Sequence, residues 1–243
     1  MNFDKGQHFL TNHEILKKEI KLVELSKKDN VIEIGSGTGN LTKLLAESGV
    51  NVISFEIDNG FREVLNELEK EYSNLKIRIK DALKDDWRSA NKIVANIPYH
   101  LSEAIVMKTI KDGIEKAVFI VGEKFKCKIL GETKIGLMAR YFYDIKEIMK
   151  VSREEFSPSP RIDSWLIVMD KKSNVNDKEK IMQNFVLYKG KIKNGLVSSF
   201  VRKGMTKNDS KKLITDWNLN GEILNKNVGK LTYELLRKIE KLI

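Results

Sequence analysis

The chain has 243 residues and a mass of 28.0 kDa, which fits one large domain or a large domain with a small one. Hydrophobic residues make up 41% of it and charged residues 32%, so the composition excludes disordered and collagen-like proteins. No apolar run approaches the roughly 18 residues of a membrane span, and the first ten residues lack a signal peptide's apolar core. The single cysteine, Cys127, excludes an internal disulfide and a multi-cysteine zinc site. We therefore expect a cytoplasmic globular protein with no metal site and no membrane partner.

The net charge of +10 is distributed unevenly. Residues 1–170 contain 27 Lys and Arg and 27 Asp and Glu, whereas residues 171–243 contain 17 and 7. The C-terminal segment therefore carries the whole positive excess. Such asymmetry favours a polyanionic partner, because lysines placed on phosphates release condensed counterions. A lysine-rich composition common to the organism's proteins is the alternative explanation.

Strands alternate with amphipathic helices over the first two-thirds of the chain. The first helix, at 14–25, places Glu19 among the apolar residues of one face. The elements that we expect after it are strand 31–34, helix 40–48, strand 50–57, helix 60–72, strands 75–79 and 92–95, helix 102–112, strand 117–121, helix 123–130 and strands 141–151 and 163–169. This order predicts an α/β fold whose mostly parallel sheet is covered by helices on both faces.

A polar segment without periodicity, 171–177, predicts a domain boundary. Beyond it we expect four helices, at 178–188, 194–201, 208–217 and 231–242. The predicted domains are thus residues 1–172, with the sheet, and residues 173–243, which are small, basic and all-helical.

The loop Glu33-Ile-Gly-Ser-Gly-Thr-Gly39 joins the first of these strands to the next helix. Its glycines allow positive φ and a close approach of ligand to backbone, and the helix N-terminus adds a favourable dipole. Dinucleotide binders, nucleoside binders and simple tight turns share this pattern. Two acids at neighbouring strand ends narrow the choice of ligand. Glu56 can accept both hydroxyls of a ribose, and Asp81, followed by Ala82, can accept from an adenine amine. The set favours an adenosine-containing cofactor, and the loop lacks the Gly-Lys-Ser/Thr of a triphosphate-binding loop.

The tetrapeptide Asn96-Ile97-Pro98-Tyr99 follows the strand at 92–95. An adenine N6 amine is a poor nucleophile, because its lone pair is delocalised into the ring. Hydrogen bonds to the Asn96 side-chain carbonyl and to the Ile97 peptide carbonyl, held by Pro98, would localise that lone pair, and Tyr99 offers a face for stacking. A sulfonium methyl as electrophile needs no strong general base, so proximity and alignment would supply most of the rate. An Asn-x-Pro turn with a buried tyrosine is the alternative.

Six motifs occur in the order seen in the ribosomal RNA adenine N6,N6-dimethyltransferases, and with them residues 7–164 resemble the KsgA type of that family and its Erm resistance relatives. The motifs are Gln7-His-Phe-Leu10, Glu33-Ile-Gly-Ser-Gly-Thr-Gly39, Glu56-Ile-Asp58, Asp81-Ala82, Asn96-Ile-Pro-Tyr99 and Phe156-Ser-Pro-Ser-Pro-Arg-Ile-Asp-Ser164. The resemblance implies a class I (Rossmann-like) methyltransferase domain that uses S-adenosyl-L-methionine, followed by a small helical domain that contacts RNA.

The resemblance also implies roles for individual residues. Phe156 would stack on the target base opposite Tyr99, which suits a flipped or looped-out adenosine, and Asn96 would touch both cofactor and target. The implied catalytic residues are Asn96, Ile97, Pro98, Tyr99 and Phe156. The implied cofactor-binding residues are Gln7, His8 and Leu10 with Gly35 and Gly37 at the methionine end, Glu56 at the ribose, Asp81 and Ala82 at the adenine, and also Ile57 and Asn96.

This chain departs from the family pattern in three places. His8 stands where the family often has Asn, and Lys134-Ile-Gly-Leu137 is a reduced version of a Tyr-Gly-Arg-Leu stretch. A C-terminal arginine cluster is replaced by lysines, which keep the charge but lose the bidentate grip on phosphate; these are Lys189, Lys191 and Lys193. The last two departures concern ribosome docking rather than chemistry.

The Gly6-Gln start and the stretch ending at Ser164 favour the KsgA type. That type implies dimethylation of two adjacent adenosines near the 3′ end of the rRNA in an immature small ribosomal subunit, with no obligate protein partner. The alternatives are an Erm-type enzyme acting on large-subunit rRNA, a DNA adenine methyltransferase and a non-catalytic nucleic-acid-binding relative. Ile97 stands where DNA enzymes carry a first proline, and the intact Asn96, Pro98 and Tyr99 argue against lost catalysis.

Overall fold

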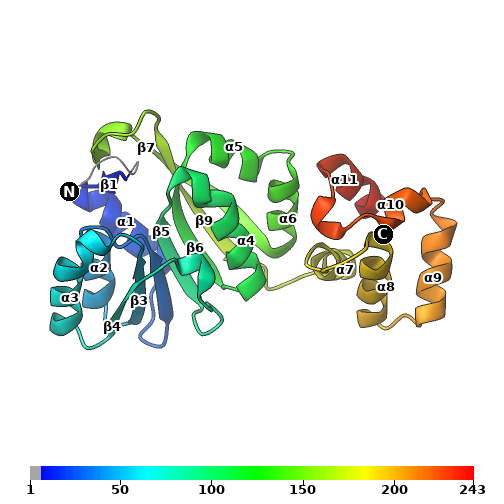
Figure 1. The fold of residues 1–243 in the computed structure, drawn as a ribbon, viewed down its shortest axis with the longest axis horizontal. Helices are drawn as coiled ribbons and strands as arrows, with labels where there is room; N and C mark the ends of the chain where they lie inside the picture. The colour runs from blue at the N-terminus through cyan, green and yellow to red at the C-terminus, as the bar shows by residue number, and fades with distance from the viewer. Residues whose placement is uncertain (1–6) are drawn as a thin grey trace. The chain divides into compact units, whose positions relative to one another are not determined.

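The computed structural model of this protein describes residues 7–243 (Figure 1). Gly6, which the sequence analysis groups with the Gln7 motif, lies outside these residues. The described chain divides into two compact units, of which the first contains residues 7–127 and 144–171 and the second contains residues 128–143 and 172–243.

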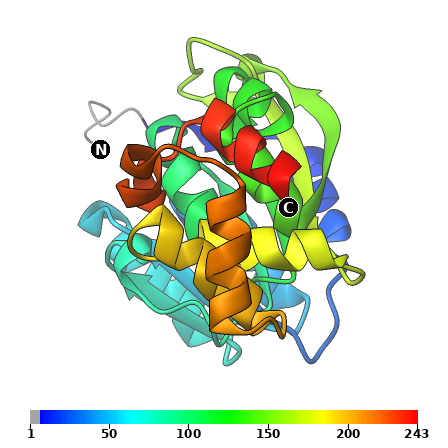
Figure 2. The same cartoon turned by 90° about the vertical axis from the view of Figure 1, so that its right-hand side faces the viewer.

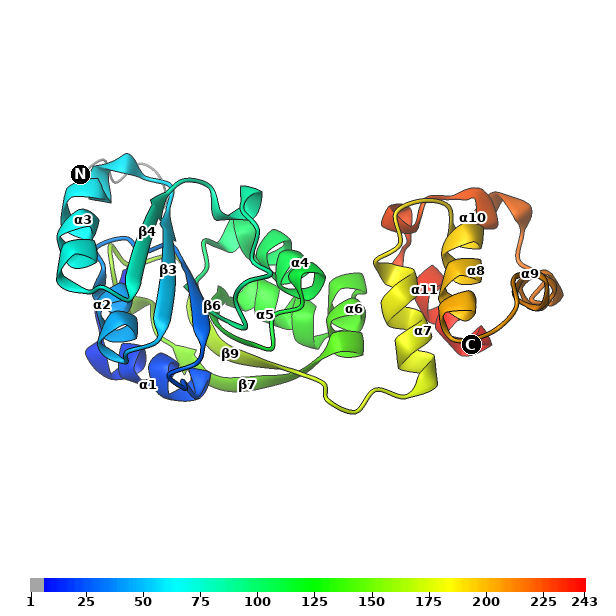
Figure 3. The same ribbon diagram turned by 90° about the horizontal axis from the view of Figure 1, so that it is seen from below.

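A seven-stranded sheet forms the centre of the first unit, in the spatial order β4-β3-β2-β5-β6-β9-β7 (Figures 1 and 3). β2 pairs in parallel with β3 and β5, β3 with β4, and β5 with β6, whereas β9 runs antiparallel to β6. The predicted mostly parallel sheet is therefore confirmed, and its strand order reverses between β2 and β5. The strands are β2 (Asn30–Ile34), β3 (Asn51–Glu56), β4 (Leu75–Ile79), β5 (Lys92–Asn96), β6 (Lys116–Gly122), β7 (Tyr143–Val151) and β9 (Ser164–Lys171).

Helices cover both faces of this sheet, with α1 to α3 on one face and α4 on the other (Figures 1 and 3). The side chain of Asn12 starts α1 by accepting hydrogen bonds from the backbone N–H groups of Glu14 and Ile15. The helices are α1 (His13–Val23), α2 (Asn40–Glu47), α3 (Arg62–Glu71), α4 (Ser102–Asp112) and α5 (Glu123–Leu130), and the 3₁₀ turns are η2 (Asn59–Phe61), η3 (Ala82–Lys84), η4 (Tyr99–Leu101) and η5 (Arg153–Glu155).

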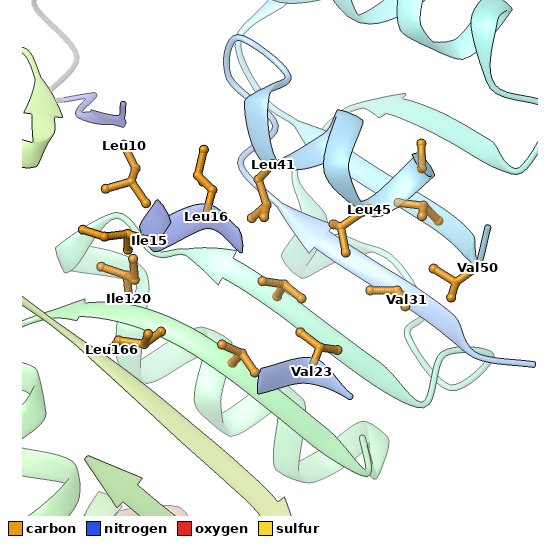
Figure 4. Packing of buried hydrophobic residues seen from close by; sticks show 14 of the residues in the cluster. Leu10, Ile15, Leu16, Val23, Val31, Leu41, Leu45, Val50, Ile120 and Leu166 are labelled. Carbon is orange, nitrogen blue, oxygen red and sulfur yellow. The ribbon is translucent and has the colours of Figure 1, made fainter. Parts of the chain in front are cut away.

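The core beneath α1 and α2 is built from stripes of apolar side chains at helical spacing. Figure 4 shows Leu16 close to Leu41, and Ile15 between Leu10 and Ile120 of the sheet. Burying one such side chain stabilises the fold by about 2–3 kcal/mol. Glu19 lies in the same stripe of α1 and is also buried, which makes it the exception on an otherwise apolar face.

A small antiparallel pair joins two segments about 150 residues apart in the sequence. β1 (Phe9–Leu10) pairs with β8 (Phe156–Ser157), which places Leu10 opposite Phe156. Both the backbone N–H and the hydroxyl of Thr11 donate to the Glu155 carbonyl, each over 2.9 Å. The periodicity does not predict this pair, because each strand is only two residues long.

The second unit consists of helices, and those beyond residue 172 run in colour from yellow α7 to red α11 in Figure 2. All four helices expected beyond residue 177 are present, as α7, α8, α9 and α11. No helix within residues 7–243 combines the length and apolar character needed to cross a membrane. The elements are α6 (Lys134–Phe142), α7 (Asp177–Val186), α8 (Ile192–Arg202), α9 (Lys207–Asp216), α10 (Gly221–Asn225), η6 (Val228–Lys230) and α11 (Tyr233–Leu242).

Two expectations about residues 128–143 were wrong. The expected strand from 141 begins at Tyr143 and is preceded by α6, and residues 128–143 belong to the second unit rather than to the sheet domain. α6 packs on α7 and α11, and its buried side chains include Leu137 and Tyr141. The Gln183 side chain of α7 also donates to the Tyr141 carbonyl over 2.5 Å.

Candidate active site

The predicted cofactor residues converge because the parallel strands β4, β3, β2 and β5 end at the same edge of the sheet. Gly35 follows β2, Glu56 ends β3, Asp81 follows β4 and Asn96 ends β5. The edge lies where the strand order reverses, and open α/β sheets bind ligands at such a point. The fold thus brings together four residues that are up to 61 positions apart.

The glycine loop adopts the backbone that its sequence suggests. Gly35, Gly37 and Gly39 have φ of +84°, +52° and +86°, in the region that side chains rarely adopt. A Cβ at Gly37 would lie 2.6 Å from Cε1 of the Phe9 ring, and one at Gly39 would collide with Leu68. A Cβ at Gly35 would meet only the Asn96 carbonyl oxygen, at 4.0 Å. Among these three glycines, therefore, only Gly35 has open space in the direction of an added Cβ.

Glu56 holds the loop in place from the end of β3. The residue is 5% exposed, and its carboxylate accepts the Gly37 N–H at Oε2 and the Asp58 N–H at Oε1, each over 2.8 Å. A carboxylate has about four acceptor positions, so Glu56 keeps capacity for two more donors. The next side chain, Ile57, is 70% exposed, and Gln7 Nε2 reaches Asp58 Oδ2 over 3.5 Å.

Asp81 and Ala82 form the turn after β4. Asp81 Oδ1 caps η3 by accepting the Leu83 N–H over 3.0 Å, and its Oδ2 lies 3.9 Å from the Lys84 ammonium nitrogen. Ala82 is buried, and its carbonyl accepts the indole N–H of Trp87 over 2.9 Å. The turn is therefore fixed, while Asp81 Oδ2 has, among residues 7–243, only the long ion pair with Lys84.

Asn96 ends β5 with its side-chain oxygen unused. Oδ1 is buried and accepts no hydrogen bond from any residue in the described part of the chain. The Ile97 N–H donates to the Ile120 carbonyl over 3.0 Å, and the Pro98 carbonyl accepts the Leu101 N–H over 2.8 Å, which starts η4. Rigid backbone on both sides therefore positions a buried acceptor without a partner.

Tyr99 presents part of its ring to solvent from a fixed position. The residue is 36% exposed, and its hydroxyl shares a 2.9 Å hydrogen bond with the Ser164 hydroxyl and lies 3.4 Å from the Ile162 carbonyl. Gly122 lies against the ring, because a Cβ there would be 2.9 Å from Tyr99 Cδ1. Sequence reasoning missed Gly122, although a glycine that ends an apolar strand can signal close approach of another group.

Phe156 is not placed as a base-stacking residue. It is 7% exposed and packs in the core with Leu10, its partner in the β1–β8 pair. The His8 ring stacks with the Tyr99 ring, at 6.5 Å between centroids and 27° between planes. His8 Nδ1 is hydrogen-bonded to the Pro158 carbonyl over 2.8 Å.

A buried acid lies behind the glycine loop. Burial raises the pKa of Glu33 to about 7, although hydrogen bonds from the Ser54 and Thr42 hydroxyls lower it and the nearby Glu56 carboxylate raises it further. Glu33 Oε1 has no partner in residues 7–243. Its other oxygen, Oε2, accepts hydrogen bonds from Thr42 of α2 and Ser54 of β3. These bonds link both elements to β2, the strand that precedes the glycine loop.

Solved methyltransferase structures have this fold. The 23S rRNA methyltransferase ErmE superposes with a TM-score of 0.66 at 21% identity, covering 96% of this chain and 98% of that chain. A dimethyladenosine transferase from Plasmodium falciparum gives 0.66 at 24% identity, covering 95% of each chain. Together with the strand order and the glycine loop, these matches confirm the predicted fold class, the Rossmann-like α/β fold.

Sequence comparisons identify the family. The model of the family "Ribosomal RNA adenine dimethylase" matches residues 1–237. A probable ribosomal RNA small subunit methyltransferase A of Pyrococcus abyssi is 30% identical over 245 residues, covering 97% of this chain and 89% of the relative. The ribosomal RNA small subunit methyltransferase A of Clostridium botulinum is 32% identical over 263 residues, covering 97% and 95%. The chain therefore belongs to the ribosomal RNA adenine dimethylase family, and the predicted family and enzyme class are confirmed.

Proposed function

We propose that this protein transfers methyl groups from S-adenosyl-L-methionine to the N6 amines of two adjacent adenosines near the 3′ end of small-subunit rRNA, in ribosome biogenesis in the cytoplasm. The observation that carries the proposal is the buried Oδ1 of Asn96, which has no partner among residues 7–243 and comes three residues before the anchored ring of Tyr99. The choice of small-subunit rRNA follows from relatives named small subunit methyltransferase A.

The residues at the sheet edge fit the cofactor. Gly35 borders open space, Glu56 has acceptor capacity for ribose hydroxyls, and the exposed Ile57 offers an apolar surface to the adenine. Asp81 Oδ2 can accept from the adenine amine, with Ala82 packed beside it.

Four residues would surround the methionine end of the cofactor, and Leu10 would do so through the packing of β1. The four are Gln7, His8, Leu10 and Gly37. When bound, S-adenosyl-L-methionine supplies an electrophilic sulfonium methyl group.

The target amine is activated by acceptors rather than by a base. Asn96 Oδ1 and the Ile97 carbonyl accept hydrogen bonds from N6, which localises its lone pair, and Pro98 holds that carbonyl in place. Tyr99 stacks on the flipped base. Holding amine and methyl donor in line then supplies most of the acceleration. Stacking of Phe156 on the other face requires its ring to leave the core, so we assign base stacking to Tyr99 first.

Exposed lysines of the second unit would bring the rRNA to this site. Lys189, Lys191 and Lys193 are all exposed, and none has an ion pair among the described residues. Such lysines contribute affinity through counterion release without reading sequence. An immature small ribosomal subunit supplies the phosphates, and no obligate protein partner is needed.

The test is methylation of immature small ribosomal subunits by the purified protein with labelled S-adenosyl-L-methionine, followed by mass mapping of the modified adenines. We expect two adjacent dimethylated adenosines near the 3′ end. Asn96→Ala should lose activity while it still binds RNA and S-adenosylhomocysteine, and Asn66→Ala on α3 serves as the matched control.

Two results would contradict the proposal. Label confined to large-subunit RNA would favour an Erm-type activity. RNA binding with no methylation by the wild-type protein on either subunit would favour a non-catalytic relative.

A further inference from the structure

A polar pocket of about 420 Å³ lies within the first unit, and the proposed chemistry does not use it. Three segments form its walls: the start of α5 at Glu123, residues 152–154 at η5 and residues 161–163 before β9. The last segment belongs to the motif that begins at Phe156. That motif suggests a stacking phenylalanine, but Phe156 is buried, and it is the exposed Arg161 that lines a pocket instead.

The pocket adjoins the Tyr99 ring at two points. Gly122 lies against the ring, and the next residue, Glu123, lines the pocket. The Tyr99 hydroxyl lies 3.4 Å from the carbonyl oxygen of Ile162, which also lines the pocket and follows Arg161. The pocket is therefore next to the ring on which the target base is proposed to stack.

Most of the charges in this pocket are paired with one another. The Asp163 carboxylate lies 2.7 Å from the Lys150 ammonium nitrogen and accepts the Arg153 N–H over 3.0 Å. The Glu154 carboxylate accepts from Arg153 Nε over 2.9 Å. These contacts hold η5 against the segment before β9 and neutralise the charges that take part in them.

Two charged side chains of the pocket are left over. Arg161 and Glu123 are exposed, and neither side chain has a hydrogen bond or a salt bridge within the described residues. A guanidinium binds phosphate through two parallel N–H groups, and a carboxylate accepts hydrogen bonds from the amino group of a base. A free cation and a free anion in one pocket therefore match a nucleotide, whereas the carboxylate would repel a simple anion.

We propose that this pocket is a subsite for the nucleotide next to the target adenosine in the rRNA strand. Arg161 binds the phosphodiester of that nucleotide, and Glu123 accepts from the amino group of its base. This inference rests on the proposed function, because it places a second nucleotide of the same substrate.

The continuity of the strand supports this assignment. A base that stacks on Tyr99 leaves its covalently linked neighbour on the adjoining surface, where the pocket lies. Its volume falls within the range of about 300–1,000 Å³ typical of sites for small ligands. The proposed substrate contains two adjacent adenosines, so the neighbour of one target is an adenosine, whose N6 amine is a donor that Glu123 can accept.

The test measures binding of two probes, adenosine and adenylyl-adenosine, to the full chain saturated with S-adenosylhomocysteine. NMR titrations compare wild type, Arg161→Ala and Arg88→Ala, the last being the same change at an exposed arginine in the turn before β5. Wild type and Arg88→Ala should bind adenylyl-adenosine about tenfold more tightly than adenosine, because only the first probe carries a phosphodiester. Arg161→Ala should bind both probes within about twofold of each other.

A third probe, adenylyl-uridine, tests Glu123, because uracil has no amino group. Wild type should prefer adenylyl-adenosine to adenylyl-uridine about threefold, and Glu123→Ala should lose this preference. The preference is a ratio measured within one protein, so a general loss of folded protein does not change it.

Methylation of immature small ribosomal subunits supplies the second readout. Arg161→Ala should raise KM about tenfold, while its dissociation constant for S-adenosylhomocysteine and its melting temperature stay at the wild-type values. A wild-type protein that binds adenylyl-adenosine no more tightly than adenosine would overturn the inference, as would an undiminished difference in Arg161→Ala. Failure of the proposed function would appear instead as absence of small-subunit methylation by wild type, which the probe titrations do not involve.

Discussion

The backbone N–H of Gly37 donates to Glu56 Oε2 over 2.8 Å, and this hydrogen bond links the glycine loop after β2 to the acid at the end of β3. The second oxygen of the same carboxylate accepts the Asp58 N–H. Glu56 therefore has two functions, since it shapes the loop and also retains the acceptor positions proposed for the ribose. A site organised in this way pays little ordering cost when its ligand binds.

Glu56→Gln should weaken S-adenosylhomocysteine binding by at least tenfold. The amide turns an NH₂ group toward the N–H of either Gly37 or Asp58, which breaks one loop contact and leaves a donor unpaired at a cost of about 1–3 kcal/mol. Isothermal titration calorimetry measures the effect, with Glu63→Gln on the exposed side of α3 as the control. Binding by Glu56→Gln within twofold of wild type would show that the carboxylate is not part of the cofactor site.

Periodicity predicts most of this fold because most of its elements bury one clear face. The strands at 75–79 and 92–95 and the helix at 102–112 lie within a residue of their expected bounds. α6 was missed because the run from Ile135 to Tyr141 is apolar on nearly every side, and a helix buried all round has no helical period to detect. β1 and β8 were missed because a two-residue strand carries no pattern.

The site was predictable where a residue type signals its own chemistry, as for the glycine loop and Glu56. It was not predictable where the role comes from a neighbour distant in sequence. Gly122 matters only because the Tyr99 ring lies on it. Phe156 shows the reverse case, because its motif suggests an exposed stacking ring whereas β1 covers it.

Gly122→Ala should lower kcat about tenfold or more, because a methyl group 2.9 Å from Cδ1 forces the Tyr99 ring away from the position fixed by Ser164. Binding of S-adenosylhomocysteine should not change, since Gly122 lies on the target side of the site. The control is Gly221→Ala, where an added Cβ meets no atom within 4 Å. Full activity of Gly122→Ala would mean that the ring position is not critical.

Replacing Lys189, Lys191 and Lys193 together by Gln should weaken rRNA binding and lower the steepness of its salt dependence. Each lost phosphate contact reduces the slope of log K against log salt by about 0.7–0.9. Filter binding over a range of salt concentrations measures this, and cofactor binding should be unaffected. Removing three exposed lysines of the first unit, Lys18, Lys27 and Lys28, is the matched control. An equal change of slope in both triple variants would mean that net charge, and not this cluster, binds the RNA.

Asp29→Asn should destabilise the first unit at neutral pH, by an amount that shrinks in acid. The Asp29 carboxylate is buried, lies 2.7 Å from the Lys92 ammonium nitrogen and accepts from the Asn91 side chain and the Ser26 N–H. Burial alone would raise its pKa, but these hydrogen bonds and the Lys92 charge outweigh burial and lower it. A carboxyl whose pKa is lowered by folding stabilises the native state above its unfolded pKa of about 4 and loses that contribution as the pH falls through the folded pKa. Breaking such a pair at neutral pH should cost about 3 kcal/mol.

Urea unfolding of wild type and Asp29→Asn at a series of pH values tests this directly. The difference in unfolding free energy should be largest near neutral pH and should narrow below about pH 4, because the wild-type carboxyl then takes up a proton while the asparagine does not titrate. Glu67→Gln, which removes an exposed carboxylate paired with Lys70, should leave the pH profile of wild type nearly unchanged. A constant difference across the whole series would assign the loss to the Asn91 and Ser26 hydrogen bonds instead of to the charge on Asp29.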